Sequence, residues 1–256
     1  MGARVLGELV RCCLLVLLLL LWTCTGTAQG LLIFNNRVAN SVEAPIYNLD
    51  PSNPAFAQYG NGVVYNGAPL AGAGFTGQLF GGPTNRPLEQ LTAIEPSAVF
   101  RIGDAAGHII PPNRAVAVPD VPEGQRAKVQ LRAWDNRGGT ITNWEQAVAN
   151  PTVALGASLS TITPPLGSVF TAPPNLVGLQ SFSLALPIRL SSLRRTANGN
   201  FRFDYINPTG IPYCIEASTD LKLWSRLGNI PAGNGSYADT TAANQSHRFY
   251  RVVPCD

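Results

Sequence analysis

The sequence has little charge and few of the side chains that hold metal ions or act as nucleophiles. Charged residues make up 13% of the 256 residues, with two histidines and five cysteines. The formal net charge of +3, spread without a run of Lys and Arg, excludes a basic stripe for nucleic acid. After residue 28 only two cysteines and two histidines remain, too scattered to predict the three or four ligands of a zinc site. The composition therefore predicts no metal, no cofactor and no nucleic-acid partner.

The sequence also lacks an apolar run long enough for a transmembrane helix. Its longest run, Cys12–Trp22, has about eleven residues, whereas a helix needs about 20 to cross a bilayer. A short basic segment precedes this run, and Gly26 and Ala28 follow at the −3 and −1 positions of a signal-peptidase site, which accepts only small side chains. We predict a signal peptide over 1–28 and no membrane span in the remaining chain.

Export makes the mature chain a secreted, extracellular or cell-surface protein, with the periplasm as an alternative. Two other fates stay open: lipidation at Cys24, and retention of the uncleaved segment as an anchor. Trp22 and Thr23 fit a lipoprotein signal poorly, so cleavage after Ala28 is the prediction.

Helical periodicity is missing as well. No long stretch places apolar residues at i, i+3, i+4 and i+7, whereas short runs of alternating apolar and polar residues recur between turns rich in Gly and Pro. This spacing predicts an all-β fold, with an antiparallel, jelly-roll-like β-sandwich over residues 30–187. The one exception is a single helical turn expected over 143–150.

The clearest alternating run extends from Ala127 to Trp134. Successive side chains of a strand point to opposite faces. The run therefore predicts a core face of Ala127, Val129, Leu131 and Ala133 and a solvent face of Lys128, Gln130, Arg132 and Trp134. The residues that follow, 135–139, are typical of a tight turn.

A change of pattern indicates a second unit. Residues 188–199 are polar, lack alternation and end in the turn signal Asn198-Gly199. We predict a linker there. Alternation restarts with Phe201, Phe203 and Tyr205, so a small C-terminal β module, itself a sandwich, is expected over 200–256.

Two sets of residues carry a resemblance. In the C-terminal unit they are Glu216-Ala217-Ser218-Thr219-Asp220-Leu221, Trp224, Asp239 and Arg248-Phe249-Tyr250-Arg251-Val252; near the N-terminus they are Ile33–Asn36, Pro45–Tyr47 and Gly74–Phe80. The first set (EASTDL…W…RFYRV) resembles a small β module at the C-termini of secreted proteins of planctomycetes and verrucomicrobia. The second resembles uncharacterised exported proteins of the same bacteria. Neither resemblance implies an activity.

The two cysteines outside the N-terminal segment are both expected on the outward side of their strands, because side chains alternate between the two faces. With Tyr213, Ile215 and Ala217 facing the core, Cys214 faces outward, and Cys255 lies on the outward face of the last strand, so both share one face if those strands are neighbours. We predict a Cys214–Cys255 disulfide, worth about 3–4 kcal/mol in the chain-entropy model. Two separate buried thiols are the alternative.

Candidate catalytic residues are few. The nearest approach to a nucleophile elbow, Gly156–Ser160, lacks the second glycine and the following helix that this turn requires. His108 and His247 are interpreted as surface residues, and the chain is not expected to be an enzyme. The loop carboxylates considered for calcium are Asp50, Asp104, Asp120 and Asp135. None of them forms a D-x-D-x-D/N-G run, so all are interpreted as solvated turn residues.

Aromatic side chains are the remaining candidates for ligand binding, because the apolar C–H faces of sugars stack on exposed rings. Trp134 lies on the predicted solvent face beside Asp135, and Trp144 follows nearby. The alternative for Trp134 is burial, the commoner environment of tryptophan, and Trp224 is expected in the core of the small module. Two functions remain: a non-catalytic secreted or cell-envelope protein of structural or interaction type, and a carbohydrate-binding accessory protein. The partner would be a polysaccharide or another envelope protein.

Overall fold

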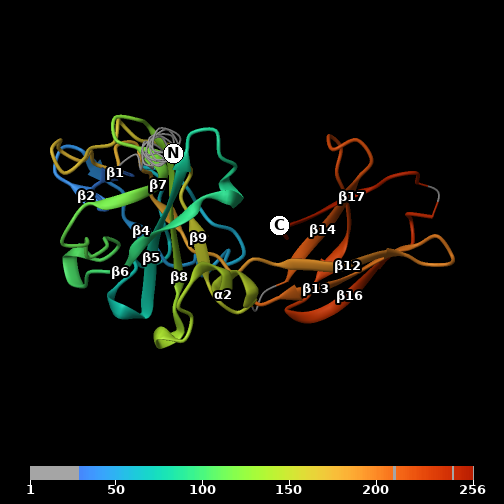
Figure 1. Cartoon of the computed structure of the whole chain (residues 1–256). Helices are drawn as coiled ribbons and strands as arrows, with labels where there is room; N and C mark the ends of the chain where they lie inside the picture. Colours follow the sequence, from blue (N-terminus) through green and yellow to red (C-terminus); the bar gives the residue numbers. More distant parts are fainter. Residues whose placement is uncertain (1–28, 210–211, 244, 256) are drawn as a thin grey trace, which may run out of the picture.

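The computed structural model describes residues 29–209, 212–243 and 245–255. They form two β units joined by a single stretch of chain, a large unit coloured blue to yellow and a small one coloured orange to red (Figure 1). The predicted signal peptide, 1–28, lies outside the described residues. Within the described ranges, no helix has the length and apolar character needed to cross a membrane.

The large unit is built on an antiparallel sheet of long strands. The strand order is β10-β8-β5-β6, and β9 also pairs with β8. These strands are β5 (Phe75–Pro83), β6 (Thr92–Val99), β8 (Ala127–Asp135), β9 (Leu155–Ala157) and β10 (Thr161–Ile162). The central pair, β5 and β8, stays in register from Phe75 opposite Asp135 to Pro83 opposite Ala127.

Short strand pairs pack against the inner face of this sheet. They are β1 (Gln29–Leu32) with β7 (Val116–Pro122), β2 (Arg37–Val38) with β3 (Val42–Glu43), and β4 (Ile46–Tyr47) with β11 (Phe182–Ser183). The β4–β11 pair is parallel. Leu32, Ile46 and Phe182 of these pairs are fully buried in one cluster with Leu79 and Leu131 of the long strands. The prediction of an all-β, sandwich-like fold is confirmed.

Short helical turns connect the strands of the large unit. They are η1 (Gly72–Gly74), η2 (Leu88–Gln90), η3 (Gly103–Ala105), η4 (Arg137–Gly139) and α2 (Trp144–Ala149). The helical turn predicted over 143–150 is confirmed as α2. Its first turn is capped by Asn143, whose Oδ1 accepts a hydrogen bond from the Gln146 backbone at 2.9 Å.

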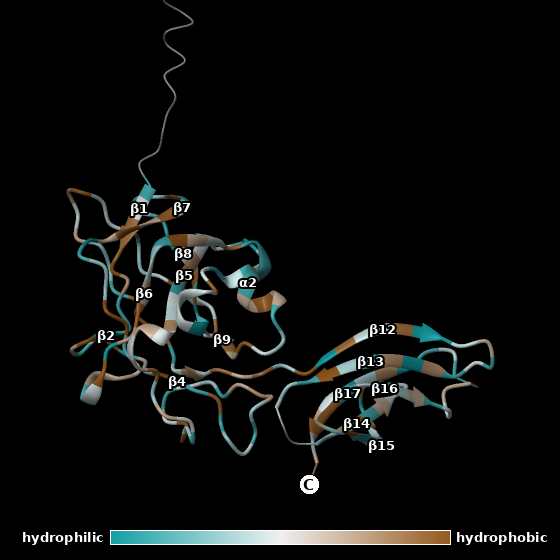
Figure 2. Ribbon diagram, turned by 90° about the horizontal axis from the view of Figure 1, so that it is seen from below, coloured by the Kyte–Doolittle hydropathy of each residue, from teal (hydrophilic) through white to brown (hydrophobic). Residues whose placement is uncertain are grey.

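The alternation in β8 is confirmed for the core face and wrong for half of the other face, where Lys128 and Gln130 are partly exposed. The four residues predicted to be buried lie in the main core: Ala127, Val129, Leu131 and Ala133. On the opposite face, however, Arg132 is only 8% exposed and Trp134 is fully buried. The reason is that α2 packs against this side of β8, as both ribbon views show (Figures 1 and 2).

The small unit consists of two three-stranded antiparallel sheets, of order β12-β13-β16 and β15-β14-β17. Their strands are β12 (Arg189–Arg195), β13 (Phe201–Asn207), β14 (Tyr213–Ser218), β15 (Ser225–Ile230), β16 (Gly233–Asp239) and β17 (Phe249–Pro254). Phe203 and Tyr205 of one sheet meet Ile215 and Ile230 of the other in a separate core. The small unit therefore has an apolar core of its own.

The linker predicted over 188–199 is wrong, because most of that segment is strand β12. It pairs with β13, with Leu190 opposite Tyr205, and its C-terminal end is hydrophilic (Figure 2). The register shifts between Ser191 and Arg194, and Ser192 between them has a φ of 54°. A bulge of this kind interrupts the two-residue period, and an edge strand has a neighbour on one side only. The segment therefore lacks the alternation of a strand buried on one face.

The two units contact each other through a tyrosine. The Tyr213 hydroxyl of β14 accepts a hydrogen bond from the Ala55 backbone N–H at 3.1 Å and donates one to Asn53 Oδ1 at 3.0 Å. Its ring lies 5.8 Å from that of Phe56, centroid to centroid. Tyr213 is fully buried, and burial is the largest influence raising its pKa. The predicted inward direction of Tyr213 is confirmed, but part of its packing comes from the large unit.

Candidate functional site

A groove on the outer face of the main sheet is the candidate site that includes a predicted binding residue, Trp144. It lies between α2 and η2, above β8, and has a volume of about 560 Å³. Its lining residues are Leu88, Glu89, Gln130, Arg132, Trp144, Glu145, Val148 and Ala149. The groove exists because α2 covers only one end of the outer face of β8 and leaves the side chains of Gln130 and Arg132 beside it.

Trp134 does not line the groove. It is fully buried beneath α2, where it packs with Ala147 and Val153, and its indole Nε1 donates to the Ile141 carbonyl at 3.0 Å. The predicted solvent-facing Trp134 is therefore wrong, and the alternative of burial holds. A ring without an exposed face cannot stack on a sugar.

Asp135 is used within the turn that follows β8. Its Oδ1 accepts a hydrogen bond from the Arg137 backbone at 2.9 Å, and its Oδ2 lies 3.4 Å from Arg137 Nε. It is not among the residues of the groove. Of the three predicted site residues, the groove includes Trp144 alone.

Trp144 is the first residue of α2 and is partly exposed. Its ring meets the rings of Trp134 and Phe80 edge to face, at centroid distances of 6.1 and 6.4 Å. Edge-to-face packing of this kind is favourable for aromatic pairs. Two buried aromatic neighbours therefore fix the position of the Trp144 ring at the wall of the groove.

Arg132 is the groove residue that sequence reasoning missed as a binding group. Its guanidinium carbon lies 3.9 Å from the Phe80 ring centroid and 5.2 Å from that of Trp144. Its Nε donates to Gln130 Oε1 and its Nη2 to the Leu88 carbonyl, both at 2.9 Å. These contacts hold a nearly buried cation in one orientation. The sequence alone placed Arg132 on the non-core face of its strand, but it did not show which elements surround the side chain.

The charge of Arg132 has no direct counter-ion within the described ranges, since its hydrogen bonds go to neutral oxygens. Burial lowers the pKa of the guanidinium, and the charge of Glu145 acts in the opposite direction. Glu145 and Glu89 are exposed residues of the groove wall. The groove thus combines one buried cation, two exposed carboxylates and an aromatic ring.

Two N–H groups of the groove have no acceptor within the part of the chain that the structure describes. They are Nη1 of Arg132 and the indole Nε1 of Trp144. Neither of these two nitrogen atoms is fully buried, so both are accessible to solvent. Polar N–H groups beside a groove are available to an oxygen acceptor of a ligand.

The residues of the C-terminal motif form a different kind of cluster. Arg248 Nε lies 2.8 Å from Oδ2 of the buried Asp239, and the Tyr250 hydroxyl donates to the same oxygen at 3.1 Å. Burial, and then the neighbouring carboxylate, raise the pKa of Tyr250. These contacts connect the end of β16 to the start of β17. The cluster holds the small unit together and leaves no carboxylate oxygen of Asp239 free, because Oδ1 accepts from the Thr241 backbone and hydroxyl.

Trp224 is not a core residue, contrary to the prediction. It is partly exposed, and the Arg251 guanidinium lies 4.2 Å from its ring centroid. Arg251 also pairs with Glu216 at 2.7 Å. The motif tryptophan therefore covers an ion pair on the outer face of the β15-β14-β17 sheet.

The histidines are engaged in local contacts. His108 is only 5% exposed, so its interpretation as a surface residue is wrong; Nε2 lies 2.9 Å from Glu43 Oε1 and Nδ1 lies 3.1 Å from the Ala105 carbonyl. His247 is exposed as predicted and contacts the Thr219 carbonyl at 3.0 Å. Within the described ranges, no three His, Cys, Asp or Glu side chains are grouped so that they could hold a metal ion.

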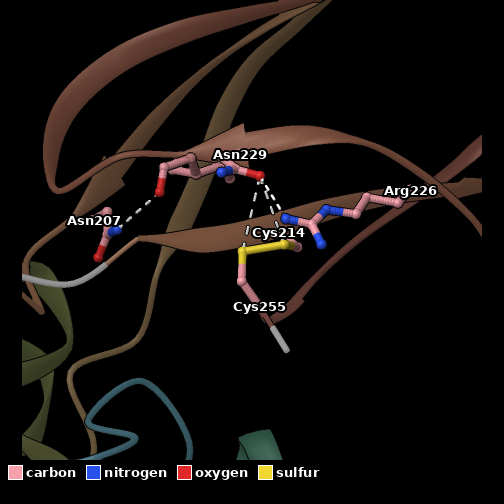
Figure 3. The surroundings of a disulfide bond; sticks show 6 residues. Asn207, Cys214, Arg226, Asn229 and Cys255 are labelled. Carbon is pink, nitrogen blue, oxygen red and sulfur yellow. Dashed lines mark hydrogen bonds between the residues drawn. A yellow bond between two sulfur atoms is a disulfide. The ribbon is translucent and has the colours of Figure 1, made fainter.

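The predicted Cys214–Cys255 disulfide is confirmed, with the two Cα atoms 5.0 Å apart (Figure 3). Cys214 lies opposite Val253 in the β14–β17 pair, so Cys255, two residues later, shares its face. Cys214 is nevertheless buried. Figure 3 shows Asn229 of the neighbouring strand β15 beside both sulfur atoms, so this outward face is covered at the disulfide.

Comparison of the chain with protein-family models, with curated proteins and with solved structures finds no match. The candidate site therefore rests on its geometry alone.

Proposed function

We propose that this chain is a non-catalytic exported β-protein, secreted or held in the cell envelope, that acts through structural or binding contacts. The observation that carries the proposal is the way the C-terminal motif is used. Asp239 and Glu216 are each paired with an arginine, and Tyr250 donates to Asp239. A general acid or base must be able to exchange a proton with a substrate, whereas these groups connect strands to one another.

Export is tested on the full chain expressed in a bacterium with a C-terminal tag. We expect the protein in the extracytoplasmic fraction, with the mass of a chain that begins at Gln29, because signal peptidase accepts Ala28 at −1. The matched control is Ala28→Leu, which should accumulate as the uncleaved precursor. Full-length protein in the cytoplasm would contradict export, and turnover of ester, glycoside or peptide substrates by the purified protein would contradict the non-catalytic role.

A second candidate function is that of a carbohydrate-binding accessory protein. It is favoured by the partly exposed Trp144 in a groove that also presents Arg132 and two carboxylates. Binding sites for small ligands combine an apolar surface with a few fixed polar groups in this way.

The carbohydrate function is tested on a glycan array. The wild-type chain should bind at least one polysaccharide, and Trp144→Ala should abolish that signal because the substitution removes the aromatic wall of the groove. Trp224→Ala is the matched control, since it removes a partly exposed tryptophan from the other unit. An array without any signal for the wild-type chain would exclude this second function and leave the first standing.

A further inference from the structure

We propose that the groove beside α2 binds a neutral, hydroxyl-rich sugar chain, with Arg132 Nη1 and Trp144 Nε1 as its hydrogen-bond donors. This proposal deepens the second candidate function and rests on it. It specifies the chemical class of the ligand, the two donor atoms and the orientation of the groups that recognise it.

Arg132 is more than nine-tenths buried and lines the groove, yet its Nη1 has no acceptor among the described residues and is not itself fully buried. Its orientation is fixed by Gln130, Leu88 and the Phe80 ring. A donor held in place before the ligand arrives loses little conformational entropy on binding. The site is therefore prepared for an oxygen acceptor.

The lining of the groove has one cation, Arg132, and two carboxylates, Glu89 and Glu145, and Arg189 donates to the carbonyls of Val148 and Ala149 at its wall, so the charges of the groove and its rim balance. A ligand that carries carboxylates would meet both glutamates with the same sign of charge. A neutral hydroxyl can accept from Arg132 and donate to a glutamate, because it has both a hydrogen and lone pairs. Charge complementarity therefore favours a neutral polyhydroxyl ligand over an acidic one.

Leu88 and Val148 are 39% and 43% exposed at the groove, and they provide apolar surface beside the Trp144 ring. The C–H face of a pyranose ring is apolar, whereas its rim carries hydroxyls. The groove of about 560 Å³ lies within the usual size range of ligand sites. An open groove of this kind accepts a segment of a chain.

The experiment is isothermal titration calorimetry of the full-length protein, purified after export, with cellohexaose, mannohexaose and laminarihexaose. Hexagalacturonate, of equal length and negative charge, is the comparison ligand. At least one neutral hexaose should bind more tightly than hexagalacturonate, and its affinity should change little between low and high salt, because no ligand charge is involved.

The donor atoms are tested with Trp144→Phe, which keeps an aromatic ring and removes Nε1–H. We expect about a tenfold loss of affinity for the neutral hexaose, because a hydrogen bond is lost and a ligand oxygen is left unpaired. Arg132→Lys should weaken binding by a similar factor, since lysine lacks the planar fork of donors. Trp224→Phe should leave the affinity unchanged. Thermal unfolding of each variant checks that it is folded.

The outcomes separate this proposal from the function on which it rests. Tighter, salt-sensitive binding of hexagalacturonate would overturn the neutral ligand class. A neutral hexaose that binds Trp144→Phe and Arg132→Lys as well as wild type would overturn the groove, while a positive glycan array would still support carbohydrate binding. If the array is positive and none of the three neutral hexaoses binds, the assigned ligand class is wrong. A negative array would remove the carbohydrate function itself.

Discussion

Replacing both disulfide cysteines, as Cys214→Ala with Cys255→Ala, is expected to lower the free energy of unfolding of the small unit by about 3–4 kcal/mol. The two residues are 41 positions apart, so the bond closes a loop that contains most of β14 and all of β15, β16 and β17. Without it, the unfolded chain gains the conformations that the closed loop excludes. In a unit whose core is formed by few large side chains, this loss is a large fraction of the total stability.

Urea denaturation monitored by tryptophan fluorescence measures the effect. Trp224 reports on the small unit, whereas Trp134 and Trp144 report on the large one. The transition of the small unit should move to lower urea in the double variant, and the transition of the large unit should stay where it is. Reduction of the wild-type chain is the matched control and should reproduce the shift. A small-unit transition that is unchanged in both cases would contradict the prediction.

The pairing of the cysteines was predictable because two cysteines allow one intramolecular pairing, and parity places both on one face once β14 and β17 are neighbours. In a strand, the inward positions of Tyr213 and Ile215 imply the outward position of Cys214, and this relation needs no knowledge of distant residues. The same rule predicted the core face of β8. Both successes come from the two-residue period, which is a local property of extended backbone.

The environment of the opposite face of β8 was not predictable in the same way. Alternation shows that Arg132 and Trp134 share a face, but it does not show what covers that face. The answer depends on α2 and on Leu88, which lies 44 positions from Arg132. Strand β12 was missed for a related reason: its bulge removes the period on which the prediction depends. Arg132 therefore emerges as a binding group only when segments distant in sequence are placed side by side.

Trp134→Ala is expected to lower the stability of the large unit by about 3–5 kcal/mol, the usual cost of truncating a buried large aromatic residue. Trp134 is fully buried, contacts Ala147 and Val153 and donates to the Ile141 carbonyl. The substitution leaves a cavity beneath α2 and a carbonyl without its donor, and both effects are destabilising. Urea denaturation of the large unit measures the change.

The comparison with Trp144→Ala separates a structural tryptophan from a binding one. Trp144 is partly exposed, so its truncation should cost less stability than that of Trp134 while removing the aromatic wall of the groove. Trp134→Phe, which retains most of the buried apolar volume, should recover much of the stability because it leaves a smaller cavity. It should also keep the affinity for a neutral hexaose, because Trp134 does not line the groove. If Trp144→Ala lowers the stability of the large unit more than Trp134→Ala does, the assignment of Trp134 as structural and Trp144 as binding is contradicted.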